Sequence, residues 1–163
     1  MKKYELTSET KIVFGHILYR IKALSSFGYV SAGDLGGFLE SEKNLSQNGN
    51  AWVSGNARVY GNAEVYGNAE VYGSARVSGN AEVSKIGSIF WIGAVGSRND
   101  TATFFRCTDG VVRVTCGCFF GNLDEFAKKV RKTHGDNDHA KVYMLAIDMA
   151  KIRISTEKEK TEE

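Results

Sequence analysis

The run Ser97-Arg98-Asn99-Asp100-Thr101 has the residue types best suited to holding a ligand. An arginine can bind a phosphate or carboxylate through paired hydrogen bonds, and Ser, Asn and Thr side chains beside it can add more. A structural interpretation stays open, in which Asn99 and Asp100 form a turn while Arg98 pairs with Asp100 or covers the end of the preceding repeat. The run is therefore expected to be either a ligand loop or a cap.

A second group of cations lies in a stretch after Asn122 that is predicted to be helical. Lys128, Lys129, Arg131 and Lys132 would form a basic face that extends the same site, although a solvated helix face is the ordinary explanation of such a charge run. The candidate ligand-binding residues are Ser97, Arg98, Asn99, Asp100, Thr101, Lys128, Arg131 and Lys132.

A metal site could be built from Cys107, Cys116, Cys118 and His134. The single residue between Cys116 and Cys118 differs from the two-residue spacing that is usual in structural zinc sites. Cysteines two apart on a strand can both face a core, where they behave as small apolar side chains. His134 falls in the last turn of the expected helix, where the helix dipole favours a cation. We therefore expect buried cysteines, no metal site and no cofactor.

The element expected to position these residues is a repetitive tract, in which one six-residue phrase recurs six times from Ala51 to Val83. The phrase places Ala at 51, 57, 63, 69, 75 and 81, and Val two residues after each; Gly87/Ile89 and Gly93/Val95 continue it loosely. Residues two apart on a strand face the same side, so Ala and Val are expected to point inward. Gly and Asn supply the corners, because they tolerate positive φ. Three copies would complete one turn of 18 residues, and successive turns would pair as parallel strands, as in a solenoid.

The residue between each Ala and Val is expected to face outward, above the residue 18 positions earlier. Arg58 would then stack with Arg76, and Glu64 with Glu82, which gives one basic wall and one acidic wall. Contact between unlike walls closes under threefold symmetry, so a homo-oligomer, most naturally a trimer, is predicted. The interface candidates are Trp52, Arg58, Tyr60, Glu64, Tyr66, Tyr72, Arg76 and Glu82.

Residues 1–48 are predicted to form an N-terminal cap and a degenerate first coil. Tyr4-Glu5-Leu6-Thr7 and Ile17-Leu18-Tyr19-Arg20-Ile21 are expected strands around a loop at Gly15-His16. A repetitive β structure needs its open end covered against edge-to-edge pairing, which gives this segment its expected role.

The C-terminal part, residues 97–154, is predicted to be a β-hairpin followed by two helices. The hairpin would join Thr101–Cys107 to Val111–Cys116 through an Asp109-Gly110 turn. Asn122 and Glu125 form a capping-box pair for the first helix, Gly135 is expected to end it, and Asp138 is expected to cap the second. The expected buried faces are Leu123, Phe126, Ala127 and Val130 on the first helix, and Ala140, Tyr143, Ile147, Ala150 and Ile154 on the second. The polar tail, residues 155–163, is expected to be disordered.

The expected fold is thus mainly β with a small α+β C-terminal part, in which a short parallel β-helix over residues 49–96 separates the N-terminal cap from the hairpin and helices. Length and composition agree with this, because 163 residues allow one compact domain or a solenoid with a small cap. The net charge of +2 gives no nucleic-acid signature. The sequence has neither a membrane-length apolar run nor a signal peptide, and three cysteines are too few for a disulfide framework. A soluble, cytoplasmic protein is predicted.

The repeats resemble the hexapeptide-repeat left-handed β-helix, whose pattern of an aliphatic residue followed four positions later by a small one is matched by Val59 and Ala63. The left hand is an implication of this resemblance. Hexapeptide-repeat proteins include acyltransferases that use a histidine as general base, but the repeats here contain no histidine and make fewer than three turns. Acyl transfer is therefore kept as the alternative function.

The whole arrangement resembles small accessory proteins encoded by tailed phages and prophages. The segments that carry this resemblance are Leu18–Leu24, Ala32–Leu45, the repeats, Gly96–Thr101, Gly117–Gly121 and His134-Gly135. The resemblance implies a non-catalytic protein in the host cytoplasm that binds or sequesters a host factor, either a defence protein or a small phosphorylated or nucleotide ligand. Counter-defence is the expected role, and a purely structural phage component is the second alternative.

Overall fold

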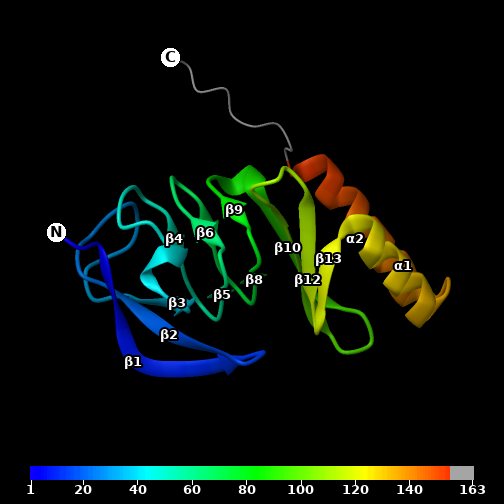
Figure 1. Cartoon of the computed structure of the whole chain (residues 1–163), viewed down its shortest axis with the longest axis horizontal. Helices are drawn as coiled ribbons and strands as arrows, with labels where there is room; N and C mark the ends of the chain where they lie inside the picture. The colour runs from blue at the N-terminus through cyan, green and yellow to red at the C-terminus, as the bar shows by residue number, and fades with distance from the viewer. Residues whose placement is uncertain (155–163) are drawn as a thin grey trace, which may run out of the picture. The chain divides into compact units, whose positions relative to one another are not determined.

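A computed structural model describes residues 1–154, and the chain divides into two compact units, Met1–Ile86 and a second that begins at Gly87 (Figure 1). The strands of the first unit are β1 (Tyr4–Val13), β2 (His16–Ala23), β3 (Leu35–Leu39), β4 (Trp52–Val53), β5 (Arg58–Val59), β6 (Glu64–Val65), β7 (Glu70–Val71), β8 (Arg76–Val77) and β9 (Glu82–Val83), with a 3-10 turn at Glu42–Asn44. A second 3-10 turn, Ile86–Ser88, lies at the junction between the units.

The short strands β4 to β9 come from the repeats and pair in parallel with an offset of 18 residues. Trp52 lies opposite Glu70, Arg58 opposite Arg76, and Glu64 opposite Glu82. Every repeat Ala and Val is buried, as the two-residue spacing predicts. The corners carry glycines with positive φ, such as Gly61 at 67°, where a Cβ would lie 3.3 Å from the backbone N of Gly79.

The predicted left-handed β-helix is wrong. Within residues 1–154 the strands form a mixed five-stranded sheet in the order β1-β2-β3-β5-β8, two separate parallel pairs (β4-β7 and β6-β9) and an antiparallel four-stranded sheet, and no left-handed solenoid. Two features break the expected regularity. The antiparallel hairpin β1-β2 continues into the same sheet as the repeat strands, and the loose copies after Val83 pair antiparallel with the segment that follows them.

The N-terminal segment supplies donors to the carbonyl groups at the start of the repeats. Ala51 O accepts a 2.8 Å bond from Lys3 Nζ, and Ala63 O accepts a 2.9 Å bond from the fully buried Asn44 Nδ2. In the same way, the backbone N–H of Phe38 donates to Ala57 O at 2.9 Å. Three polar groups that would otherwise be buried without partners are thereby satisfied.

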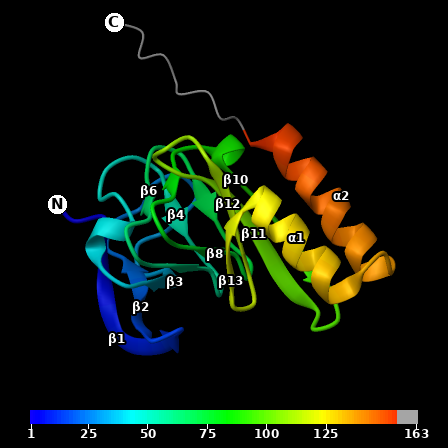
Figure 2. The same ribbon diagram turned by 45° about the vertical axis from the view of Figure 1, so that its right-hand side comes forward.

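The second unit is an antiparallel sheet that packs against two helices. Its elements are β10 (Ile89–Val95), β11 (Asp100–Arg106), β12 (Val112–Cys116), β13 (Phe119–Asn122), α1 (Leu123–His134) and α2 (Asp138–Arg153). The strands follow one another in sheet order, and both helices cover one face, where Phe104, Val114, Phe126 and Ile147 share a core (Figure 2). The hairpin β11-β12 and both helices agree with the predictions, whereas β10 had been expected to belong to the repeats.

Helix boundaries follow from capping side chains. Asn122 Oδ1 accepts from the Glu125 N–H at 2.9 Å, and Glu125 Oε2 accepts from the Asn122 N–H at 2.9 Å, which completes the predicted capping box. Gly135 ends α1 with φ of 62°. The cap of α2 is Asn137, which accepts from the Ala140 N–H at 3.0 Å, so the prediction of Asp138 is wrong by one residue. The predicted disordered tail, residues 155–163, lies outside the described residues.

Candidate ligand-binding pocket

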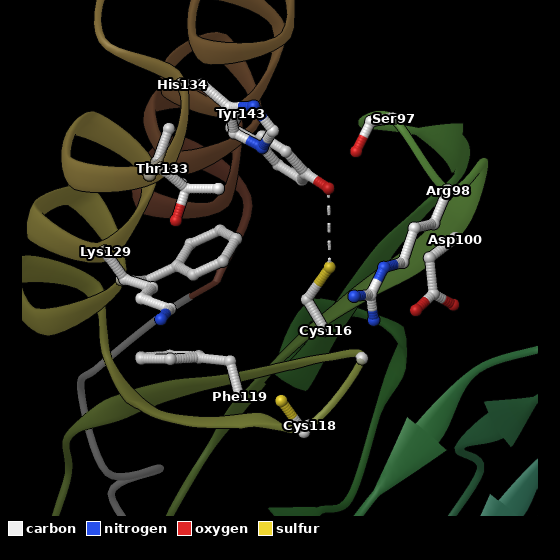
Figure 3. A pocket seen from close by; sticks show the side chains of 13 residues that line it. Ser97, Arg98, Asp100, Cys116, Cys118, Phe119, Lys129, Thr133, His134 and Tyr143 are labelled. Atoms are coloured by element: carbon white, nitrogen blue, oxygen red, sulfur yellow. Dashed lines mark hydrogen bonds between the residues drawn. The ribbon is translucent and has the colours of Figure 1, made fainter.

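A pocket of about 270 Å³ opens in the second unit between the β10-β11 turn, the β12-β13 turn and the two helices (Figure 3). Its lining residues are Ser97, Arg98, Asp100, Cys116, Gly117, Cys118, Phe119, Phe126, Lys129, Val130, Thr133, His134 and Tyr143. Three predicted candidates, Ser97, Arg98 and Asp100, are therefore brought together here with residues of both helices.

The pocket is made by two tight turns that follow from local sequence. In the first, Asn99 has a left-handed backbone with φ of 50°, and its N–H lies 3.3 Å from Gly96 O. This turn carries Arg98 on one side of the pocket (Figure 3). In the second turn, Gly117 has φ of 56°, which a glycine adopts with little strain, and joins β12 to β13.

Aromatic rings form the apolar part of the pocket. Phe119 and Phe126 lie 5.1 Å apart between ring centroids, and Phe126 meets Tyr143 edge-to-face at 5.5 Å. The His134 ring stacks on Tyr143 at 5.8 Å with an interplanar angle of 26°. A pocket with one apolar aromatic wall and a polar opening has the composition of small-molecule sites.

Tyr143 is held in place by contacts around its hydroxyl group. The hydroxyl lies 3.7 Å from Cys116 Sγ and donates to Val95 O at 3.5 Å. A Cβ on Gly96 would overlap this hydroxyl, so glycine is required there. Burial first, and then Cys116 and Asp100, raise the pKa of Tyr143, which keeps it a neutral donor at physiological pH.

The polar rim carries two cations on opposing sides. Figure 3 shows the Arg98 guanidinium on the turn side and Lys129 on the α1 side. Within residues 1–154 neither side chain forms an ion pair with an acidic residue, and the predicted Arg98–Asp100 pair is not formed. Asp100 Oδ1 instead accepts from the Thr101 N–H at 2.8 Å.

The remaining candidates lie outside the pocket lining. Asn99 and Thr101 belong to the same turn without lining the pocket, and Lys128, Arg131 and Lys132 are exposed on other parts of α1. Lys129 is the member of the basic face that lines it. No group of three or more His, Cys, Asp or Glu side chains in the described part of the chain could hold a metal ion, although Cys116, Cys118 and His134 share the pocket.

Sequence reasoning missed the aromatic wall, because Phe126 and Tyr143 fit the apolar stripes of their helices and were assigned to the core. Both do pack in the core, while one edge of each also lines the pocket. Their helical spacing gives no separate signal for this second contact. His134 had been explained by the helix dipole alone, and its stacking on Tyr143 depends on how the two helices meet.

The predicted interface residues lie in the first unit with very different exposures. Trp52, Tyr60 and Arg76 are buried, Arg58, Tyr66 and Glu82 are partly exposed, and Glu64 and Tyr72 are exposed. The Arg76 guanidinium lies 4.6 Å above the Phe14 ring of the β1-β2 hairpin, and Tyr60 meets the His16 ring at 4.7 Å. Because Arg76 is buried and Arg58 and Glu82 are only partly exposed, the outward residues do not form the predicted pair of uniform basic and acidic walls.

Comparison of the chain with models of known protein families and with curated proteins finds no match. No helix in the described range, residues 1–154, is long and apolar enough to cross a membrane.

Proposed function

We propose that the pocket of the second unit binds a small phosphorylated ligand, and that the protein acts by holding this ligand without transforming it. The observation that carries the proposal is the pair of cations, Arg98 and Lys129, on two sides of an aromatic pocket and without acidic partners among residues 1–154. Guanidinium and ammonium groups bind phosphate oxygens through charge-assisted hydrogen bonds.

The aromatic wall favours a ligand that also has a planar ring, such as a nucleotide. Phe119, Tyr143 and His134 offer ring faces and edges, and stacking of a base on an aromatic side chain contributes about 1–3 kcal/mol. Asp100 and Ser97 can accept hydrogen bonds from amino or hydroxyl groups. The volume of about 270 Å³ lies just below the usual range for small-molecule sites, so a mononucleotide-sized ligand fits better than a larger one.

The resemblance of several sequence segments to accessory proteins of tailed phages supports a biological role for such binding. A small phage protein in the host cytoplasm would sequester a nucleotide signal made by the host, and so counter a defence. Binding of a host defence protein and a structural role in the phage remain the competing explanations.

Calorimetric titration of the protein with inorganic phosphate, adenosine and the four common nucleoside monophosphates tests the proposal. We expect a nucleotide to bind more tightly than phosphate or adenosine alone. Arg98→Ala should weaken binding by about 1.5–3 kcal/mol, the contribution of a hydrogen bond to a charged group. Arg131→Ala is the matched control, because Arg131 is an exposed cation of α1 that does not line the pocket.

Two results would contradict the proposal: no binding by any of these compounds, or equal losses in Arg98→Ala and Arg131→Ala. Thermal unfolding of Arg98→Ala distinguishes a ligand-binding role of Arg98 from a role as a cap. A ligand residue leaves the melting temperature nearly unchanged, whereas a cap residue lowers it and leaves the affinity of the folded fraction unaltered.

Acyl transfer stays the second candidate because His134, the histidine that could act as a base, lines the same pocket. Incubation with acetyl-coenzyme A and amine or hydroxyl acceptors tests it. We expect no release of free thiol above background. Turnover that His134→Ala abolishes would replace the binding function with an enzymatic one.

A further inference from the structure

The helix α2 has a second apolar face, which is exposed to solvent. Val142, Leu145, Met149 and Ile152 are 40, 63, 49 and 87% exposed. They lie on the side of the helix away from Ala140, Tyr143, Ile147 and Ala150, which pack in the core of the second unit. Single exposed apolar residues are ordinary, but four that form one stripe along a helix indicate a contact surface.

We propose that this stripe binds the same stripe of a second copy of the chain, with the two α2 helices antiparallel. Its residues follow one another at intervals of three, four and three positions. This alternating interval keeps side chains along one seam between two packed helices. The occupant is therefore another helix with the same spacing, and α2 itself provides one.

The charges along the stripe select the antiparallel direction. Asp138 lies in the first turn of α2 and Arg153 in its last turn, so antiparallel packing sets the acidic side chain of one helix against the basic side chain of the other. The opposed helix dipoles favour the same direction.

A flanking pair fixes the register of the contact. Lys141 and Asp148 lie on the same flank of the stripe, seven positions apart. In an antiparallel pair centred near Leu145, Lys141 of each copy faces Asp148 of the other, so two unlike pairs form together. A parallel pair would set Asp148 beside Arg153 instead. Lys141 also forms an ion pair with Asp138 of its own helix at 3.7 Å, and both side chains remain largely exposed.

The expected dimer is weak, because α2 has 16 residues and a contact through one helix is small compared with the roughly 800 Å² per partner of standard interfaces. The association should therefore depend on protein concentration. Tyr143 projects from the opposite, buried face of α2, so the contact does not use a pocket residue.

Sedimentation velocity over a wide range of concentrations tests the proposal with the full chain. The parent protein should shift from monomer to dimer as concentration rises. Leu145→Glu and Met149→Glu should each raise the dissociation constant about tenfold or more. Because both side chains are exposed, the melting temperature of the dilute protein should stay unchanged. Asn56→Glu is the control, since it also adds one negative charge, at an exposed site outside α2.

A charge exchange tests the antiparallel register. Asp148→Lys alone should weaken the dimer, and Lys141→Glu combined with Asp148→Lys should restore it, because the exchange re-forms both unlike pairs. A parent protein that stays monomeric at every concentration, or an association that Leu145→Glu and Met149→Glu leave unchanged, would overturn the proposal. Failure of the combined variant to restore the dimer would overturn the antiparallel arrangement.

Discussion

Lys3 is a buried cation without an acidic partner among residues 1–154. The residue is 5% exposed, its Nζ donates to Ala51 O at 2.8 Å, and the Nζ lies 4.9 Å from the centroid of the Phe27 ring. Burial lowers the pKa of Lys3 from 10.5 to about 8, because the charged form loses hydration. The carbonyl acceptor and the ring compensate for part of this loss.

This shift predicts a stability that increases with pH. Between pH 8 and 10.5 the unfolded chain holds a proton on Lys3 that the folded chain lacks, so the free energy of unfolding rises with pH across this window. The slope from this group is at most about 1.4 kcal/mol per pH unit. Urea denaturation of the parent and of Lys3→Met at several pH values measures this slope. Both proteins contain the same tyrosines, so the difference between them reports on Lys3. A difference between the two that does not vary with pH would contradict the assignment.

Single residues also show where sequence reasoning stops. Arg98 could be proposed as a candidate ligand residue from its type and turn context, which are local properties, and it lines the pocket. Arg76 has the same position within its repeat as Arg58, yet the β1-β2 hairpin brings Phe14 over its guanidinium. The period predicts which side of a strand Arg76 occupies, and it contains no information about a hairpin more than 60 positions earlier.

At the scale of elements, the short strands depend on buried apolar side chains, whose surroundings offer no partner to a charged group. Val71 is fully buried and lies opposite Val53 in the β4-β7 pair. Val71→Asp should lower the free energy of unfolding by several kcal/mol, because a carboxylate there would be buried without a partner. Urea denaturation followed by circular dichroism measures the loss.

Asn56→Asp is the matched control for this prediction. It introduces the same charge at an exposed corner of the repeats, and we expect a change within about 0.5 kcal/mol. A soluble Val71→Asp protein with the melting temperature of the parent would show that the inward register is wrong.

Elements with a local or periodic signal could be predicted, and strands whose partners follow no period could not. The Asp109-Gly110 turn and the Asn122–Glu125 capping box lie within a few residues of what they organise, and both are present. β10 was assigned to the repeats because Gly87, Ile89, Gly93 and Val95 keep the six-residue spacing. Its actual partner is β11, where Phe90 lies opposite Phe104 and Ile92 opposite Ala102. Burial of these large side chains against the helices outweighs a spacing match that two glycines help to create.

The whole molecule consists of two units that each have a core of their own. Phe38 packs with Leu18 and Tyr60 in the first unit, and Phe104 packs with Phe126 and Ile147 in the second. Phe104→Ala should therefore lower the stability of the second unit by about 3–5 kcal/mol and leave the amide protection of β1 and β2 unchanged. Hydrogen exchange of the folded protein reads both units in one experiment.

Phe38→Ala is the reciprocal variant. It should lower the amide protection of the first unit and leave the amide protection of β11 and β12 unchanged. Equal loss of protection in both units after either substitution would mean that the chain unfolds as one cooperative body.

The parallel offset within the first unit has a consequence for how such a gene can change its length. Trp52 pairs with Glu70 and Arg58 with Arg76, so each strand requires a partner eighteen positions away. Loss of a single six-residue copy between these strands would keep the buried Ala and Val in register, but would move each later copy to a neighbouring side and set Glu82 opposite Arg58. Gain or loss of three copies together keeps each strand on its own side, so we expect natural relatives with longer or shorter repeats to differ in multiples of eighteen codons.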